Sequence, residues 1–72
     1  MTLDFEVPDE LIPCNLELEG MDGNAGAIIG NVRRGLRDIG NSREVIDWYV
    51  KESMSGDYHH LLRVAMVATG ML

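Results

Sequence analysis

The residues from Tyr58 to about Thr69 most constrain the fold of this chain, because they predict a helix that is apolar on nearly every side. Its apolar positions are Leu61, Leu62, Val64, Ala65, Met66, Val67 and Ala68. Such a helix must be buried, since it has no face that favours contact with water. The chain has only 72 residues, which suffice for one small core. We therefore expect a single domain over residues 1–72 that forms a homo-oligomer through this helix.

Two further helices are predicted before it, separated by a short turn. Apolar residues at intervals of three and four predict a first helix from about Asn24 to Ile39. Gly40 fits the left-handed position that commonly follows the end of a helix. A capping box that begins at Asn41 predicts a second helix that runs to about Met54.

The first part of the chain shows a different pattern. Residues 1–20 alternate between apolar and polar side chains, in one run around Phe5 and a second run that begins at Cys14. Alternation with a period of two is typical of a half-buried strand. We therefore expect an acidic antiparallel β-hairpin over residues 1–20. Together with a three-helix segment over residues 24–70, it predicts an α+β fold.

The formal net charge of −6 is unevenly distributed, because residues 1–22 contain seven acidic residues and no basic one. General nucleic-acid binding requires a basic surface, so we do not expect it. The single Cys14 excludes an intramolecular disulfide, and no Cys/His spacing matches a zinc site, so we expect no metal and no cofactor. The sequence shows neither a signal peptide nor the roughly 18 apolar residues of a membrane span. These features predict a cytoplasmic protein that does not bind membranes.

Two glycine-bearing turns open helices and are candidate anion-binding corners, because a helix N-terminus presents unpaired N–H groups and partial positive charge. The first corner contains Gly23 and Asn24, and the second contains Tyr58, His59 and His60. The small side chains of the first corner leave room for a ligand, and the tyrosine of the second offers a stacking surface. The alternative interpretation is that both turns serve only to cap their helices.

Arginines supply a second set of candidate ligand contacts. Arg33 and Arg37 are four residues apart and share a helix face, and Arg63 follows the second corner. Such side chains could hold a phosphate by bidentate hydrogen bonds, or could instead pair with the acidic segment. Arg33 lies roughly 13 Å beyond Asn24 along the helix, so a ligand that touches both must be extended or bound between subunits. No nucleophile stands beside a base, so we expect neither catalytic residues nor an enzyme.

The chain contains two motifs, DGNA at residues 22–25, which precedes an arginine-rich helix, and SGDYHHLL at residues 55–62. Together these motifs resemble a family of small uncharacterised proteins encoded by bacteria and their phages. The resemblance covers about residues 16–66. It implies no particular activity, but both motifs coincide with the two helix-opening corners.

These observations predict a non-enzymatic, homo-oligomeric protein that binds a small anionic molecule, with a nucleotide as the specific candidate. If a phage encodes the chain, sequestering a nucleotide immune signal in the host cytoplasm would suit such a small oligomer without catalytic residues. An alternative is an anti-defence inhibitor that docks its acidic hairpin on a basic protein surface. A third interpretation is a structural small subunit.

Overall fold

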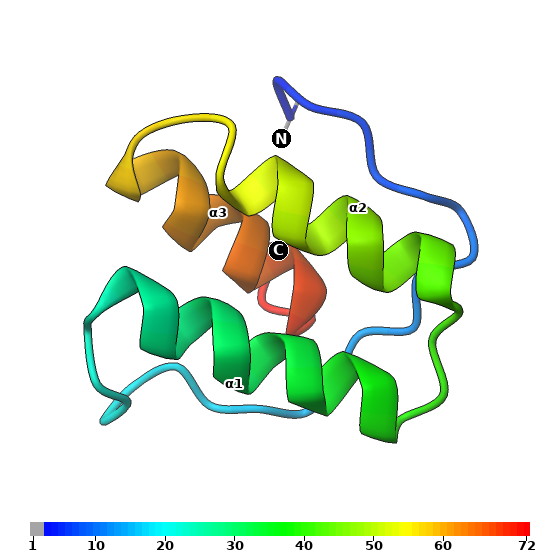
Figure 1. Cartoon of the computed structure of the whole chain (residues 1–72), viewed down its shortest axis with the longest axis horizontal. Helices are drawn as coiled ribbons and strands as arrows, with labels where there is room; N and C mark the ends of the chain where they lie inside the picture. The colour runs from blue at the N-terminus through cyan, green and yellow to red at the C-terminus, as the bar shows by residue number, and fades with distance from the viewer. Residues whose placement is uncertain (1–2) are drawn as a thin grey trace.

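The computed structural model describes residues 3–72 and contains three α-helices that pack against one another (Figure 1). Helix α1 spans Ala25–Asp38, α2 spans Arg43–Ser53 and α3 spans Tyr58–Ala68. Each helix contacts the other two. The three expected helices are therefore confirmed, and their predicted ends differ from the observed ones by about one residue.

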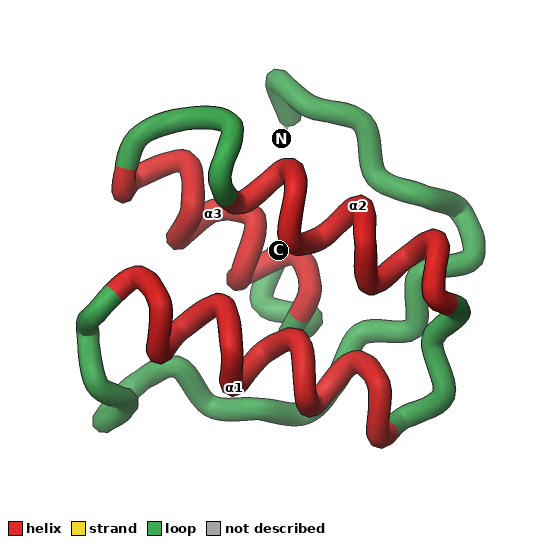
Figure 2. The backbone as a smooth tube through the Cα atoms, viewed as in Figure 1, coloured by secondary structure: helices red, strands yellow, loops and turns green. Residues whose placement is uncertain are grey.

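The expected β-hairpin is wrong, and with it the α+β fold. The described part of the chain, residues 3–72, contains no strand, so the fold is all-helical. Figure 2 shows the N-terminal segment as a loop that passes α2 and then runs along α1. Met1 and Thr2, where the hairpin was expected to begin, lie outside the described residues.

The alternation that suggested strands is nevertheless present in the structure as alternating burial. Phe5 and Leu16 are half-buried while Asp4 and Glu17 are exposed. Period-two alternation indicates an extended backbone with one face covered, but it does not specify what covers that face. Here the covering elements are helices. The side chains that pack against the helical core from this segment are Phe5, Leu11, Leu16, Leu18 and Met21.

Polar contacts with the helices replace the missing strand pairing. The Cys14 N–H donates to the Ala68 carbonyl at the end of α3 (3.0 Å). The Asn41 side chain accepts from the Ile12 N–H (2.8 Å) and donates to the Ile12 carbonyl (2.9 Å). These bonds satisfy backbone groups that a sheet would otherwise have to pair.

The core lies between the three helices and the N-terminal segment. Its buried residues include Ile28, Val32, Leu36, Val45, Tyr49, Leu61, Val64, Ala65 and Ala68. Helix α3 therefore buries its apolar sides against α1, α2 and the N-terminal segment of the same chain. The apolar pattern of α3 does not by itself require a partner subunit, and the homo-oligomer remains a prediction.

Side-chain caps begin all three helices. Asn24 caps α1 by accepting from the Gly26 N–H, and Asp57 caps α3 by accepting from the His60 N–H. The N-cap of α2 is Ser42 rather than the expected Asn41, because the side chain of Asn41 is engaged by the N-terminal segment. Gly40 follows α1 with a φ of +104°, in the left-handed conformation that the sequence predicted.

Candidate functional site

A groove between α1 and α2 gathers most of the positive charge of the protein. We call it the arginine groove; it has a volume of about 680 Å³. Gly30, Arg33, Arg34 and Arg37 line it from α1, and Arg43, Ile46 and Asp47 line it from α2. Four of the six basic residues in a chain of net charge −6 therefore face one concavity.

The arginine charges in this groove are largely uncompensated. Among the described residues, the four arginines make one ion pair, between Arg37 Nε and Asp38 Oδ1 at 3.7 Å. Both of those side chains are about two-thirds exposed (65% and 66%), so their pairing is weak. Arg33, Arg34 and Arg43 form no ion pair with a described residue. Mutual repulsion between these guanidinium groups would be relieved by a bound anion.

Arg43 adds a local electrostatic cost to this arrangement. It is the first residue of α2, where the partial positive charge of the helix N-terminus disfavours a cation. Arg37, by contrast, lies in the last turn of α1, where a cation is favoured. A charge that opposes its own helix dipole is a local conflict of the kind that functional sites often contain.

Gly30 keeps one end of the groove open. A Cβ built at this position would meet no atom within 4 Å, so packing does not require glycine here. A glycine inside a helix costs about 1 kcal/mol relative to alanine. Of the three glycines within α1, only Gly35 is held close by another segment, since a Cβ added there would lie 3.1 Å from Cys14 Sγ. The missing side chain at Gly30 therefore leaves open space in the lining of the groove.

The two helix-opening corners meet each other instead of meeting the arginines. The Tyr58 hydroxyl donates to the Gly23 carbonyl at 2.6 Å, which joins the two motifs across 35 positions of sequence. Asp22 Oδ1 accepts from the Asn24 N–H (3.0 Å). The capping side chains of Asn24 and Asp57 each accept a hydrogen bond from one N–H group of the helix that they cap. An apolar hollow of about 410 Å³ lies beside the corners, lined by residues such as Ile29. Asp22, Asn24, Asp57 and Tyr58 thus all have structural partners.

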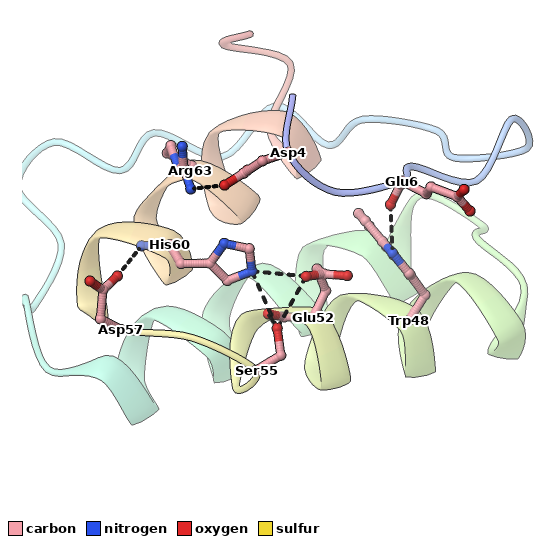
Figure 3. A network of polar contacts seen from close by, with 8 residues as sticks. All are labelled: Asp4, Glu6, Trp48, Glu52, Ser55, Asp57, His60 and Arg63. Atoms are coloured by element: carbon pink, nitrogen blue, oxygen red, sulfur yellow. Dashed lines mark hydrogen bonds and ion pairs between the residues drawn. The ribbon is translucent and has the colours of Figure 1, made fainter. Parts of the chain in front are cut away.

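His60 lies apart from both the arginine groove and the corners, in the seam between the helices and the N-terminal segment (Figure 3). Its Nε2 lies 2.8 Å from Glu52 Oε2 and 3.3 Å from Ser55 Oγ. The rings of His60 and Phe5 pack in a T-shaped arrangement, with centroids 5.2 Å apart. Arg63 donates to Asp4 Oδ2 at 2.9 Å in the same seam.

The combination of Ser55, His60 and Glu52 has the composition of a hydrolytic triad but not its geometry. In a triad the serine and the carboxylate contact different imidazole nitrogens, so that one nitrogen accepts the serine proton while the acid orients the other. Here both groups contact Nε2, and Ser55 Oγ also bonds Glu52 through its carbonyl (2.8 Å) and Oε2 (3.1 Å). The cluster ties the end of α2 to the start of α3.

The predicted site residues are therefore divided among separate places. Arg33 and Arg37 line the arginine groove; Gly23, Asn24 and Tyr58 lie at the joined corners; His60 and Arg63 lie in the seam; and His59 is exposed. In the described part of the chain the arginines and the corners line separate hollows, and a site shared between subunits stays a prediction.

Sequence reasoning missed Gly30, Arg43 and Asp47 as groove residues. A signal for Arg43 was available, because the turn after α1 is centred near Gly40. In two antiparallel helices joined by a short turn, residues equally distant from the turn lie side by side. Arg37 and Arg43 are each three positions from Gly40, which places both at the same end of the groove.

Comparison with protein-family models, with curated proteins and with solved structures gives no match for this chain. Within residues 3–72, none of the helices combines the length and the hydrophobicity needed to cross a bilayer. The same residues contain no cluster of three or more side chains able to hold a metal ion.

Proposed function

We propose that this protein is a non-enzymatic binding protein that holds a small phosphate-bearing anion, with a nucleotide as the candidate, in the arginine groove. One observation carries the proposal: two helices direct four guanidinium groups into one groove, and three of the four have no ion-pair partner among the described residues. The protein as a whole carries a net charge of −6, so the positive charge is concentrated in this groove.

The chemistry of the groove suits phosphate groups. Arginine presents a planar fork of N–H donors that matches two phosphate oxygens, and its charge is retained at any physiological pH. The groove volume of about 680 Å³ lies within the range of roughly 300–1,000 Å³ typical of small-molecule sites. Because Arg43 joins Arg33 and Arg37 across two helices of one chain, such a ligand would not need a second subunit.

Calorimetric titration with inorganic pyrophosphate, followed by nucleoside diphosphates, tests this proposal. Arg33→Lys and Arg37→Lys should each weaken binding by about tenfold, because lysine retains the charge but loses the bidentate fork. Arg63→Lys is the matched control, since Arg63 lies outside the groove in an ion pair with Asp4. Absence of binding, or an equal loss with Arg63→Lys, would contradict an anion site in the arginine groove.

The exposed acidic segment favours a second candidate, an inhibitor that docks on a basic protein surface. Six of its acidic residues are exposed without an ion pair among residues 3–72: Glu6, Asp9, Glu10, Glu17, Glu19 and Asp22. This candidate uses the segment as an extended chain rather than as a hairpin. Glu17→Gln with Glu19→Gln should abolish inhibition of such a target, whereas ligand binding in the arginine groove would be unchanged.

A further inference from the structure

Asp47 is the acidic residue in the lining of the arginine groove. It is exposed and lies one helical turn after Arg43, within the reach of an i,i+4 pair. Its carboxylate nevertheless forms no ion pair and no side-chain hydrogen bond with another described residue. A carboxylate without an ion-pair partner among the described residues therefore shares a groove with four guanidinium groups.

We infer that Asp47 selects a guanine base, so that the ligand of the arginine groove is a guanine nucleotide. This inference rests on the proposed function and names the class of ligand for the same site. An ionised carboxylate only accepts hydrogen bonds and repels phosphate. The ligand must therefore place its anionic groups at the arginines and hydrogen-bond donors at Asp47.

The pairing edges of the common bases differ in what they offer a carboxylate. Guanine presents two adjacent donors, N1–H and the exocyclic N2–H, which match the two oxygens of one carboxylate. Adenine and cytosine present one exocyclic amine beside a ring-nitrogen acceptor, and uracil and thymine flank their single N–H with two carbonyl groups. Those acceptors would face the lone pairs of the carboxylate, which is unfavourable. Guanine is therefore the base that Asp47 best accommodates.

The remaining lining of the groove suits a planar ring. Ile46 precedes Asp47 on α2, is half-buried and packs against the core, so it offers a fixed apolar surface. Gly30 on the facing helix leaves open space where another residue would project a side chain. A base seated between them would bury apolar ring surface while its donor edge reaches the carboxylate.

Calorimetric titration of the full chain with GDP, IDP and ADP tests this inference. Inosine retains N1–H but lacks the 2-amino group, so GDP should bind about tenfold more tightly than IDP and more tightly still than ADP. Asp47→Asn should remove this preference. Because an amide offers one donor and one acceptor, the same variant should gain affinity for XDP, whose base carries a carbonyl group at that position. Glu44→Gln is the matched control, an exposed acid on α2 outside the groove lining.

The outcomes separate the two proposals. Equal affinity for GDP, IDP and ADP would overturn base selection while leaving the anion site intact. A guanine preference that persists in Asp47→Asn would overturn the role of Asp47. If neither pyrophosphate nor any nucleotide binds, both the inference and the proposed function fail. Circular dichroism of each variant confirms that the helices are retained, which the exposure of Asp47 leads us to expect.

Discussion

The N-terminal segment, residues 3–24, and the helical region, residues 25–68, solve the same problem in different ways. Each must bury apolar side chains while giving its backbone groups hydrogen-bond partners. The helical region pairs its backbone internally and packs three apolar stripes together. The N-terminal segment lacks regular pairing and depends on contacts that the helices supply, such as the Cys14–Ala68 and Ile12–Asn41 bonds. The helical region is therefore the scaffold, and the segment is docked on it.

The largest effect that tests this contrast is expected from Leu36→Ala. Leu36 is fully buried in the core, and removal of its side chain should lower the free energy of unfolding by about 2–5 kcal/mol. Phe5→Ala removes a larger side chain, but from a half-buried site in the N-terminal segment, so it should cost about 1 kcal/mol. Urea unfolding followed by circular dichroism measures both. A loss from Phe5→Ala as large as that from Leu36→Ala would show that the segment is part of the scaffold.

A second test concerns the exclusion of water from the core around Tyr49. Burial raises the pKa of Tyr49 to about 12 from its ordinary value of 10.0. Between these two values the unfolded chain loses the proton while the folded chain retains it. Stability should therefore fall as pH rises from 10 to about 12, by about 1.4 kcal/mol per pH unit. Below pH 10 the tyrosine is neutral in both states and contributes no pH dependence.

Tyr49→Phe should remove this alkaline slope. At neutral pH the variant should be as stable as the original chain, because the Tyr49 hydroxyl is buried without a hydrogen-bond partner among the described residues. Unfolding by urea at several pH values between 7 and 12, as an approximate working range, gives the comparison. The same alkaline slope in both proteins would mean that Tyr49 is solvated in the folded state.

A third test concerns the contact between the two regions at Gly35. A Cβ at this position would lie 3.1 Å from Cys14 Sγ, so in Gly35→Ala the Cys14 side chain must shift slightly away from α1. Gly30→Ala is the matched control on the same helix, because its Cβ would meet no atom within 4 Å. Both substitutions gain about 1 kcal/mol of helix propensity. We expect Gly35→Ala to be less stable than Gly30→Ala by about 1–2 kcal/mol.

A double-mutant cycle separates crowding from other causes. Adding Cys14→Ala should reduce the cost of Gly35→Ala, because the smaller side chain makes room for the new methyl group. The same Cys14→Ala change should have no such effect in the Gly30→Ala background. Additive losses in both backgrounds would exclude the sulfur contact as the reason for glycine at position 35.

The contrast between the two regions also explains which parts of the fold could be predicted from the sequence. Helix periodicity and the glycine at position 40 are local signals, so they predicted α1, α2 and α3 correctly. The alternation around Phe5 reported only that an extended chain has one covered face. Whether a neighbouring strand or a helix covers that face depends on residues distant in sequence. Local pattern therefore could not distinguish a hairpin from a docked segment.

The candidate site also combines features that local sequence patterns predict with features that depend on how distant segments pack. The spacing of Arg33 and Arg37 correctly placed them on one helix face, and that face lines the groove. The contribution of Arg43 and Asp47 depends on how α2 packs against α1, which a single helix pattern does not encode. Within one chain Tyr58 lies apart from the arginines, because its hydroxyl bonds the Gly23 carbonyl at the other end of α1. A site that joins them between subunits stays a prediction.

The smallest expected effect comes from Asp4→Asn at the exposed edge of the docked segment. The hydrogen bond from Arg63 is the main reason that the pKa of Asp4 lies below its ordinary value of 3.8. Because the folded pKa is lowered, the contact contributes above the pKa of the unfolded chain and is lost as pH falls through the folded value. Both side chains are largely exposed, so we expect no measurable change in global stability at neutral pH.

The readout must therefore be local, and Trp48 supplies it as the single tryptophan of the chain. Its indole N–H donates to the Glu6 carbonyl at 3.0 Å (Figure 3). Its ring centroid lies 6.5 Å from that of Phe5. If the Arg63–Asp4 contact holds the segment in place, Trp48 fluorescence should change as pH falls below 3.8, and Asp4→Asn should already show the altered signal at neutral pH. Asp9→Asn is the matched control, an exposed acid of the same segment without an ion pair among the described residues. An identical acid transition in all three proteins would show that packing of Phe5, rather than the ion pair, holds the segment against the helices.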